Sequence, residues 1–136
     1  MKILNGASRN ATLIQCAYGN VSRAHLYDTL SSVEVNDVVE LCEFSSTLRV
    51  DSVRLVTENL GAGTKLKLGY KYSSGDKLGQ EVEDAFGTFD TSSALNQLAN
   101  FPPVELTGGD VIITAKIEGA TASGKLDAYV DYVFKG

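Results

Sequence analysis

Apolar and polar side chains alternate along several segments of the chain. The clearest case is residues 65–72, where apolar and charged positions interleave: Leu66, Leu68, Tyr70 and Tyr72 against Lys65, Lys67 and Lys71. Successive side chains of a β-strand point to opposite faces, so this pattern predicts a strand with one buried and one solvated face. Residues 111–118 and 125–135 repeat the alternation and predict two further strands of the same kind.

Four earlier segments also read as strands, with weaker patterns. Residues 11–18 place Ile14, Cys16 and Tyr18 on one face, and residues 22–29 form a less regular segment. Residues 36–44 and 48–58 carry apolar side chains on both faces, which is typical of central strands. Turn signals separate the segments at 36–37, 45–46, 61–63, 108–110 and 123–124. About seven or eight short strands predict an all-β fold: an antiparallel β-sandwich or a jelly-roll-like barrel.

The segment 73–103 departs from this pattern. Its first part is polar and rich in glycine, which predicts a long irregular loop, and its second part spaces Ala94, Leu95, Leu98 and Ala99 as in a helix. A two-turn helix ended by two prolines is one interpretation, and a strand followed by an irregular loop is the other. Long connections often contact a partner, so we expect an interface in this segment. Its candidate residues are Asp84, Phe86, Phe89, Leu95 and Phe101.

A glycine-rich stretch, Gly61-Ala62-Gly63-Thr64-Lys65, raises the question of phosphate binding. A phosphate-binding loop needs a Gly-Lys pair followed by a helix, whose first N–H groups bind the anion. Here Thr64 precedes the lysine and the next segment alternates like a strand. The stretch is therefore interpreted as a hairpin turn, in which glycine supplies positive φ.

The length, net charge and cysteine content of the chain limit the classes of protein to which it can belong. The chain has 136 residues, which suits a single domain spanning 1–136, and a net charge of −5, which disfavours nucleic-acid binding. No apolar run approaches the ~20 residues that span a membrane. The first ten residues do not resemble a secretion signal, so Cys16 and Cys42 are expected to be reduced core residues. One pair of cysteines with a single histidine falls short of a zinc site.

No set of residues predicts catalysis. His25 is the only histidine, and no nucleophile and base form a triad pattern around it. The acidic residues near 81–90 lack the order of a calcium loop, and Asp127 and Asp131 on one strand lie roughly 13 Å apart, too far for glycoside hydrolysis. We therefore expect no enzymatic activity, no metal and no cofactor.

Three stretches of the sequence carry a resemblance to a known family. They are VVEL at 38–41, LVTENLGAGTKLKLGY at 55–70 and GATASGKLDAYVDYV at 119–133. Together with the strands around them, they resemble small virion proteins of tailed bacteriophages. The resemblance implies a capsid decoration, or cement, protein: a β-sandwich that binds the major capsid protein on the outside of the head and stabilises the shell. It also implies a protein made in the host cytoplasm, and a trimer is the preferred oligomer.

A second interpretation is a tail or head-fibre β-sandwich module that binds carbohydrate or a receptor. It is suggested by the tyrosines on the predicted strands, of which Tyr129 falls on a polar face while Tyr70, Tyr72 and Tyr132 fall on apolar faces. Sugar sites expose aromatic rings, so only Tyr129 is a candidate contact residue on this pattern.

Overall fold

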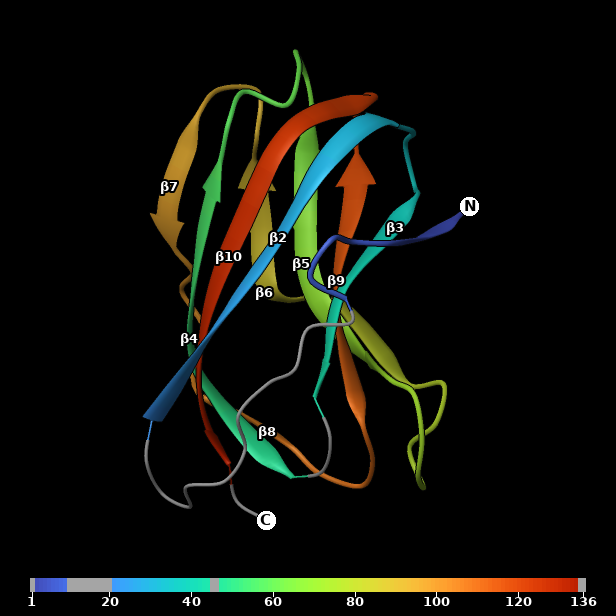
Figure 1. Cartoon of the computed structure of the whole chain (residues 1–136), viewed down its shortest axis with the longest axis vertical. Helices are drawn as coiled ribbons and strands as arrows, with labels where there is room; N and C mark the ends of the chain where they lie inside the picture. The colour runs from blue at the N-terminus through green and yellow to red at the C-terminus, as the bar shows by residue number, and fades with distance from the viewer. Residues whose placement is uncertain (1, 10–20, 45–46, 135–136) are drawn as a thin grey trace.

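Two packed β-sheets form the protein, as the computed structural model of residues 2–9, 21–44 and 47–134 shows (Figure 1). Sheet 1 has the strand order β1 (Ile3–Asn5), β3 (Val38–Phe44), β9 (Val111–Glu118), β5 (Lys65–Tyr72) and β6 (Glu81–Asp90). Sheet 2 has the order β2 (Val21–Val33), β10 (Ala122–Phe134), β4 (Leu48–Thr57) and β7 (Leu95–Leu98), with β8 (Val104–Leu106) also paired to β4. All neighbours are antiparallel except β1 and β3. The predicted all-β sandwich is confirmed.

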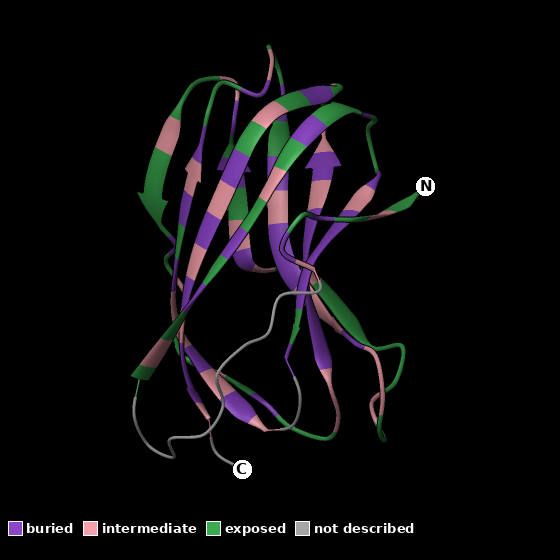
Figure 2. Ribbon diagram, viewed as in Figure 1, coloured by how far each residue is buried: buried purple, intermediate pink, exposed green. Residues whose placement is uncertain are grey.

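The core lies between the sheets and follows the predicted alternation (Figure 2). Leu66 and Leu68 of β5 are fully buried, and so are Leu126, Ala128 and Val130 of β10. Each such leucine contributes roughly 1.5–3 kcal/mol by leaving water. The central strand β9 buries residues of both parities, since Ile112 and Thr114 are only about 5% exposed.

The segment 73–103 contains strands β6 and β7, where the sequence predicts an irregular loop followed by either a short helix or a strand. β6 pairs with β5 over most of its length, but Phe86 and Phe89, which both enter the core, are three residues apart. Gly87 between them has a φ of 118°, and next to it the pairing of β6 with β5 shifts register, between Leu68 and Tyr70 of β5, so the alternation is interrupted. The spacing of Leu95 and Leu98 suggested a helix, yet these residues pair with β4, because pairing with an existing sheet satisfies the backbone of such a short segment.

The number of strands and one of the turns differ from the sequence predictions, and two other predictions cannot be compared with the structure. The structure has ten strands among its described residues, more than the seven or eight predicted: β1, β7 and β8 are only three or four residues long, and β6 lies where a loop is predicted. The predicted turn at 123–124 is instead a register shift inside β10. The predicted strand at 11–18, with Ile14, Cys16 and Tyr18, and the turn at 45–46 lie outside the described residues. No helix in the described ranges is long and apolar enough to cross a membrane.

The N-terminal segment ties the two sheets together at one side of the sandwich. β1 pairs with β3, and the Gly6 amide donates to the Glu40 carbonyl at 2.7 Å. The buried Ser8 hydroxyl then donates to the Leu41 carbonyl of sheet 1 at 2.7 Å and accepts from the Tyr27 amide of sheet 2 at 2.9 Å. One side chain thereby bridges the edges of both sheets.

Candidate functional site

The residues that the sequence nominates for a partner interface do not form one exposed patch. Phe86 and Phe89 are core residues, and the Phe86 ring packs against the half-buried Phe101 ring with centroids 5.0 Å apart. Asp84 is exposed on β6, whereas Leu95 is half-buried on β7. The phenylalanines therefore hold this part of the chain on the sandwich, and the residues free to meet a partner are their exposed neighbours.

The glycine-rich stretch joins the two sheets and does not form the predicted hairpin. β4 lies in sheet 2 and β5 in sheet 1, so the strands on either side of Gly61 and Gly63 do not pair. Positive φ at both glycines, 132° and 76°, lets the chain reverse direction as it crosses. The buried Thr64 hydroxyl lies 2.9 Å from that of Thr91, which fastens the crossing to the β6–β7 connection. The stretch is therefore a connection between the two sheets.

Among the described residues no group of histidine, cysteine and acidic side chains is placed to hold a metal ion. Two acidic side chains of β6 have other partners: Glu83 lies 3.0 Å from the Lys116 ammonium group, and Asp90 accepts hydrogen bonds from the amide and hydroxyl of Ser92. Cys42 is a free, fully buried thiol, and burial raises its pKa to about 12. A thiol with so high a pKa stays protonated and is a poor nucleophile.

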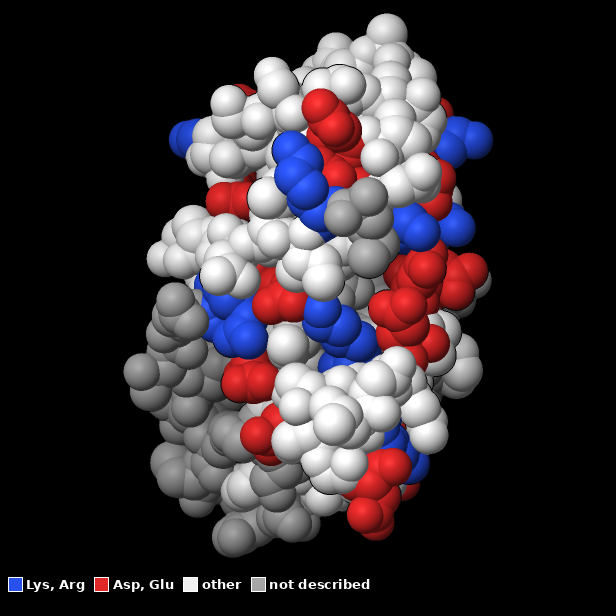
Figure 3. Space-filling model, turned by 90° about the vertical axis from the view of Figure 1, so that its right-hand side faces the viewer, with Lys and Arg blue, Asp and Glu red and all other residues white. Residues whose placement is uncertain are grey.

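Lysine and glutamate ion pairs cover the outer face of sheet 1. Glu40 binds Arg9 at 3.1 Å and Lys71 at 2.6 Å, and Lys67 lies 3.3 Å from Glu118. Burial opposes ionisation of Glu40, but the hydrogen bonds from Lys71 and Arg9 outweigh it and hold its pKa below the ordinary value. Figure 3 shows positive and negative side chains intermixed on the side of the molecule that carries the N-terminus. Opposite charges are therefore paired with one another across this face.

Aromatic and paired polar side chains cover the outer face of sheet 2. His25 of β2 stands opposite Tyr129 of β10, and their rings stack with centroids 4.7 Å apart and planes 7° from parallel. The His25 Nε2 atom lies 2.7 Å from an Asp127 carboxylate oxygen, and the Tyr27 ring lies 5.1 Å from the His25 ring. We call Tyr129, His25 and Tyr27 the ring row.

An ion pair lies at one end of the ring row. The Arg23 guanidinium binds Asp131 through two hydrogen bonds, of 2.7 and 3.2 Å, and the Ser52 hydroxyl donates to the same carboxylate at 2.8 Å. The bond from Arg23 lowers the pKa of Asp131, against the opposing effect of burial, and Ser52 adds to the lowering. The charge on Asp131 is therefore maintained at neutral pH.

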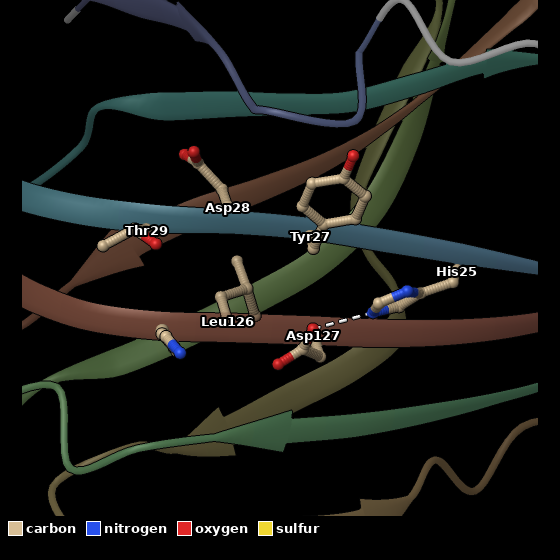
Figure 4. A pocket seen from close by; sticks show the side chains of 7 residues that line it. His25, Tyr27, Asp28, Thr29, Leu126 and Asp127 are labelled. Carbon is tan, nitrogen blue, oxygen red and sulfur yellow. Dashed lines mark hydrogen bonds and ion pairs between the residues drawn. The ribbon is translucent and has the colours of Figure 1, made fainter.

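A shallow hollow of about 270 Å³ opens at the other end of the ring row (Figure 4). It is lined by residues of β2 and β10 alone: His25, Tyr27, Asp28, Thr29, Lys125, Leu126 and Asp127. In Figure 4 the Tyr27 ring is seen face-on, with Asp28 and Thr29 on one side and His25 on the other. The hollow combines an exposed aromatic face with hydrogen-bond donors and acceptors.

Sequence reasoning found part of this site and missed the rest. It placed Asp127 and Tyr129 on one predicted strand and His25 within another, at 22–29. It did not pair these strands, because the His25–Asp127 bond joins residues 102 positions apart and alternation does not specify partners. Tyr27, which is 42% exposed, was not considered as a contact residue.

No protein-family model and no curated protein matches the chain. Solved structures do match. A chain in the capsid of Ralstonia phage GP4 has a TM-score of 0.73 and 13% identity, with 98% of both chains covered. A chain in the cyanophage Pam1 capsid asymmetric unit has a TM-score of 0.64 and 14% identity, over 92% of this chain and 94% of that one.

A third match is a chain in the acidic stable capsid structure of Helicobacter pylori bacteriophage KHP30. Its TM-score is 0.63 and its identity 17%, over 88% of this chain and 92% of that one. At such low identity the likeness establishes the fold, and it agrees with the phage resemblance found in the sequence. The protein therefore shares its fold, over nearly its whole length, with chains found in phage capsids.

Proposed function

We propose that the protein is a non-enzymatic structural protein of a phage virion that decorates the outside of the head and stabilises the shell. One observation carries the proposal: the match to a chain in a phage capsid covers 98% of both chains, so the two share a complete module rather than a common substructure. The sequence resemblance to phage virion proteins supports the same conclusion independently of the fold.

The contact with the major capsid protein is proposed to lie in the segment 73–103. Three of its apolar side chains are exposed: Leu78 at 66%, Val82 at 42% and Leu98 at 53%. Val82 and Leu98 lie on the edge strands β6 and β7, and Leu78 lies in the β5–β6 turn. Exposed apolar groups of this size are typical of protein contacts, where burial removes them from water. Asp84, also exposed, would lie at the polar rim of such a contact.

Oligomerisation is part of the proposal, with a trimer preferred. β6 and β7 end their sheets, and an unpaired strand edge tends to associate with another chain unless it is covered. Closed symmetric assemblies are the usual way in which identical subunits cover such edges. Sedimentation equilibrium of the purified protein tests this preference, and a monomer at all concentrations would contradict it.

Cosedimentation with shells that lack the protein tests the main proposal. We expect saturable binding at a copy number set by the shell lattice, and a higher melting temperature for the decorated shell. Leu78→Asp and Leu98→Asp are expected to weaken binding, whereas Val35→Asp, which charges an exposed apolar residue in the β2–β3 turn, serves as the matched control. Failure of the wild-type protein to bind shells would overturn the decoration role.

A second candidate is a tail or head-fibre module that binds carbohydrate or a receptor. The ring row favours it, because exposed aromatic rings on a sheet face are a common platform for sugars. The number of copies in each virion separates the two roles. Many copies distributed over the head fit decoration, and a few copies at one vertex fit a tail or fibre.

A further inference from the structure

We propose that the hollow at the end of the ring row binds one neutral hexopyranose unit of a polysaccharide. The inference supplies the ligand chemistry of the second candidate function, and it is compatible with decoration because a decorated head can also bind glycans. It rests on the size of the hollow, on the presentation of Tyr27 and on the balance of charge among the lining residues.

The size of the hollow suits a single small ring. Its volume of about 270 Å³ lies just below the roughly 300–1,000 Å³ of sites that enclose drug-sized ligands. The hollow is open to solvent, so neighbouring units of a longer chain can continue across the sheet. This shape fits one residue of a polymer better than an isolated metabolite.

Tyr27 offers a ring face that is held in place before any ligand binds. Its backbone is fixed on both sides, since its amide donates to the Ser8 hydroxyl at 2.9 Å and its carbonyl accepts from the Ser8 amide at 3.1 Å. The ring leans on His25 with planes 39° apart, while 42% of the residue stays exposed. The electron-rich face of an aromatic ring attracts the polarised C–H groups of a pyranose, and a ring that is already ordered loses little entropy on binding.

The polar side chains around Tyr27 match hydroxyl groups. The His25 bond uses one oxygen of Asp127, and Figure 4 shows the other oxygen turned away from His25. That oxygen accepts hydrogen bonds, the Lys125 ammonium donates them and the Thr29 hydroxyl does both. Adjacent hydroxyls of a sugar each donate and accept, so a mixed lining of this kind suits them better than a ligand with acceptors only.

The charges of the lining select against anions. Asp28 and Asp127 contribute two negative charges, against one positive charge from Lys125. Phosphate, sulfate and the acidic sugars would meet this excess of negative charge at short range, where repulsion is strong. A neutral hexose avoids that cost. The same argument excludes nucleotides as ligands of the hollow.

Amide chemical shifts of the full-length protein, recorded while methyl glucopyranosides, galactopyranosides and mannopyranosides are added separately, test the proposal. We expect at least one of these neutral glycosides to shift residues 25–29 and 125–127, with a dissociation constant on the order of 1 mM. Tyr27→Ala should abolish the shifts, and Asp127→Asn should weaken binding by about tenfold, roughly the worth of one charge-assisted hydrogen bond. Tyr129→Phe is the control, because Tyr129 belongs to the ring row but does not line the hollow.

Three results would overturn the inference: no shifts with any of the glycosides, shifts that survive both Tyr27→Ala and Asp127→Asn, or stronger shifts with glucuronic acid than with the neutral sugars. Both substituted side chains lie on the outer face, so the unperturbed core amides in the same spectra report that each variant is folded. Shell cosedimentation has a separate readout, so a failure of glycan binding is distinguishable from a failure of decoration.

Discussion

Substituting Gly69 by alanine is expected to destabilise the sandwich severely. Gly69 is a buried residue in the middle of β5, at the point where the pairing with β6 shifts register between Leu68 and Tyr70. A Cβ atom on Gly69 would lie 2.5 Å from the carbonyl carbon of Glu83 and closer still to the carbonyl oxygen of Val82. Both atoms belong to the β6 backbone, so no side-chain rotation can relieve the contact.

The loss of stability in Gly69→Ala depends on how far the backbone of β6 must move. Relief requires β6 to separate from β5, and overpacking that displaces backbone costs about 3 kcal/mol. For a domain of this size that corresponds to a fall in melting temperature of roughly 10–15 °C. Gly79 provides the matched control: it has a φ of 87° and no atom within 4 Å of an added Cβ, so alanine there costs only the left-handed backbone strain, about 1 kcal/mol.

Circular dichroism melts and urea titrations of the two variants measure the difference. Gly69→Ala should show the larger loss by both methods, with the same cooperative transition as the wild-type protein. If Gly69→Ala melts no lower than Gly79→Ala, then the backbone of β6 does not lie against Gly69, and the register shift between β5 and β6 is not at this position.

Three further predictions concern stability. Leu68→Asp, which places a carboxylate in the core, should prevent folding, whereas Lys67→Asp on the solvated face should cost about 1 kcal/mol; equal circular dichroism melts would mean that the faces of β5 are reversed. Ser8→Ala should cost about 2 kcal/mol in urea unfolding, because two backbone groups lose their partner; an unchanged midpoint would show that Ser8 does not bridge the sheets. The pKa of Glu40 is lowered on folding, so its contribution is present above its ordinary pKa of about 4.5 and is lost as the pH falls through the lower folded value. Glu40→Gln should therefore lower stability at pH 7 by about 2 kcal/mol and weaken its decline with acid, and a parallel pH profile would contradict this.

Much of the fold could be predicted from alternation alone. The period of two in residues 65–72 and 125–135 identified both the strands and their buried faces, because apolar side chains lie on the buried face of a strand and polar side chains on the solvated face. Alternation failed in β6, where the pairing with β5 shifts register next to Gly87 and both Phe86 and Phe89 are buried. The local pattern there conflicts with the three-dimensional arrangement, and only pairing with β5 reveals the strand.

The candidate site was less predictable than the fold. His25 and Asp127 were each placed on a predicted strand, yet no local feature indicated that β2 and β10 are neighbours. Their hollow exists because two strands about 100 residues apart in sequence pair in one register, and a shift of a single position would turn every side chain of one strand to the other face.

The sequence by itself determined the class of fold, the buried faces of its regular strands and the resemblance to phage virion proteins. The tertiary structure alone decided that the glycine stretch at 61–63 crosses between sheets, that the interface candidates Phe86 and Phe89 belong to the core, and that an aromatic hollow forms on sheet 2. The physical reason is the same in each case. Polarity along a chain specifies which side of a strand meets water, whereas the choice of neighbouring strand depends on contacts between residues far apart in sequence.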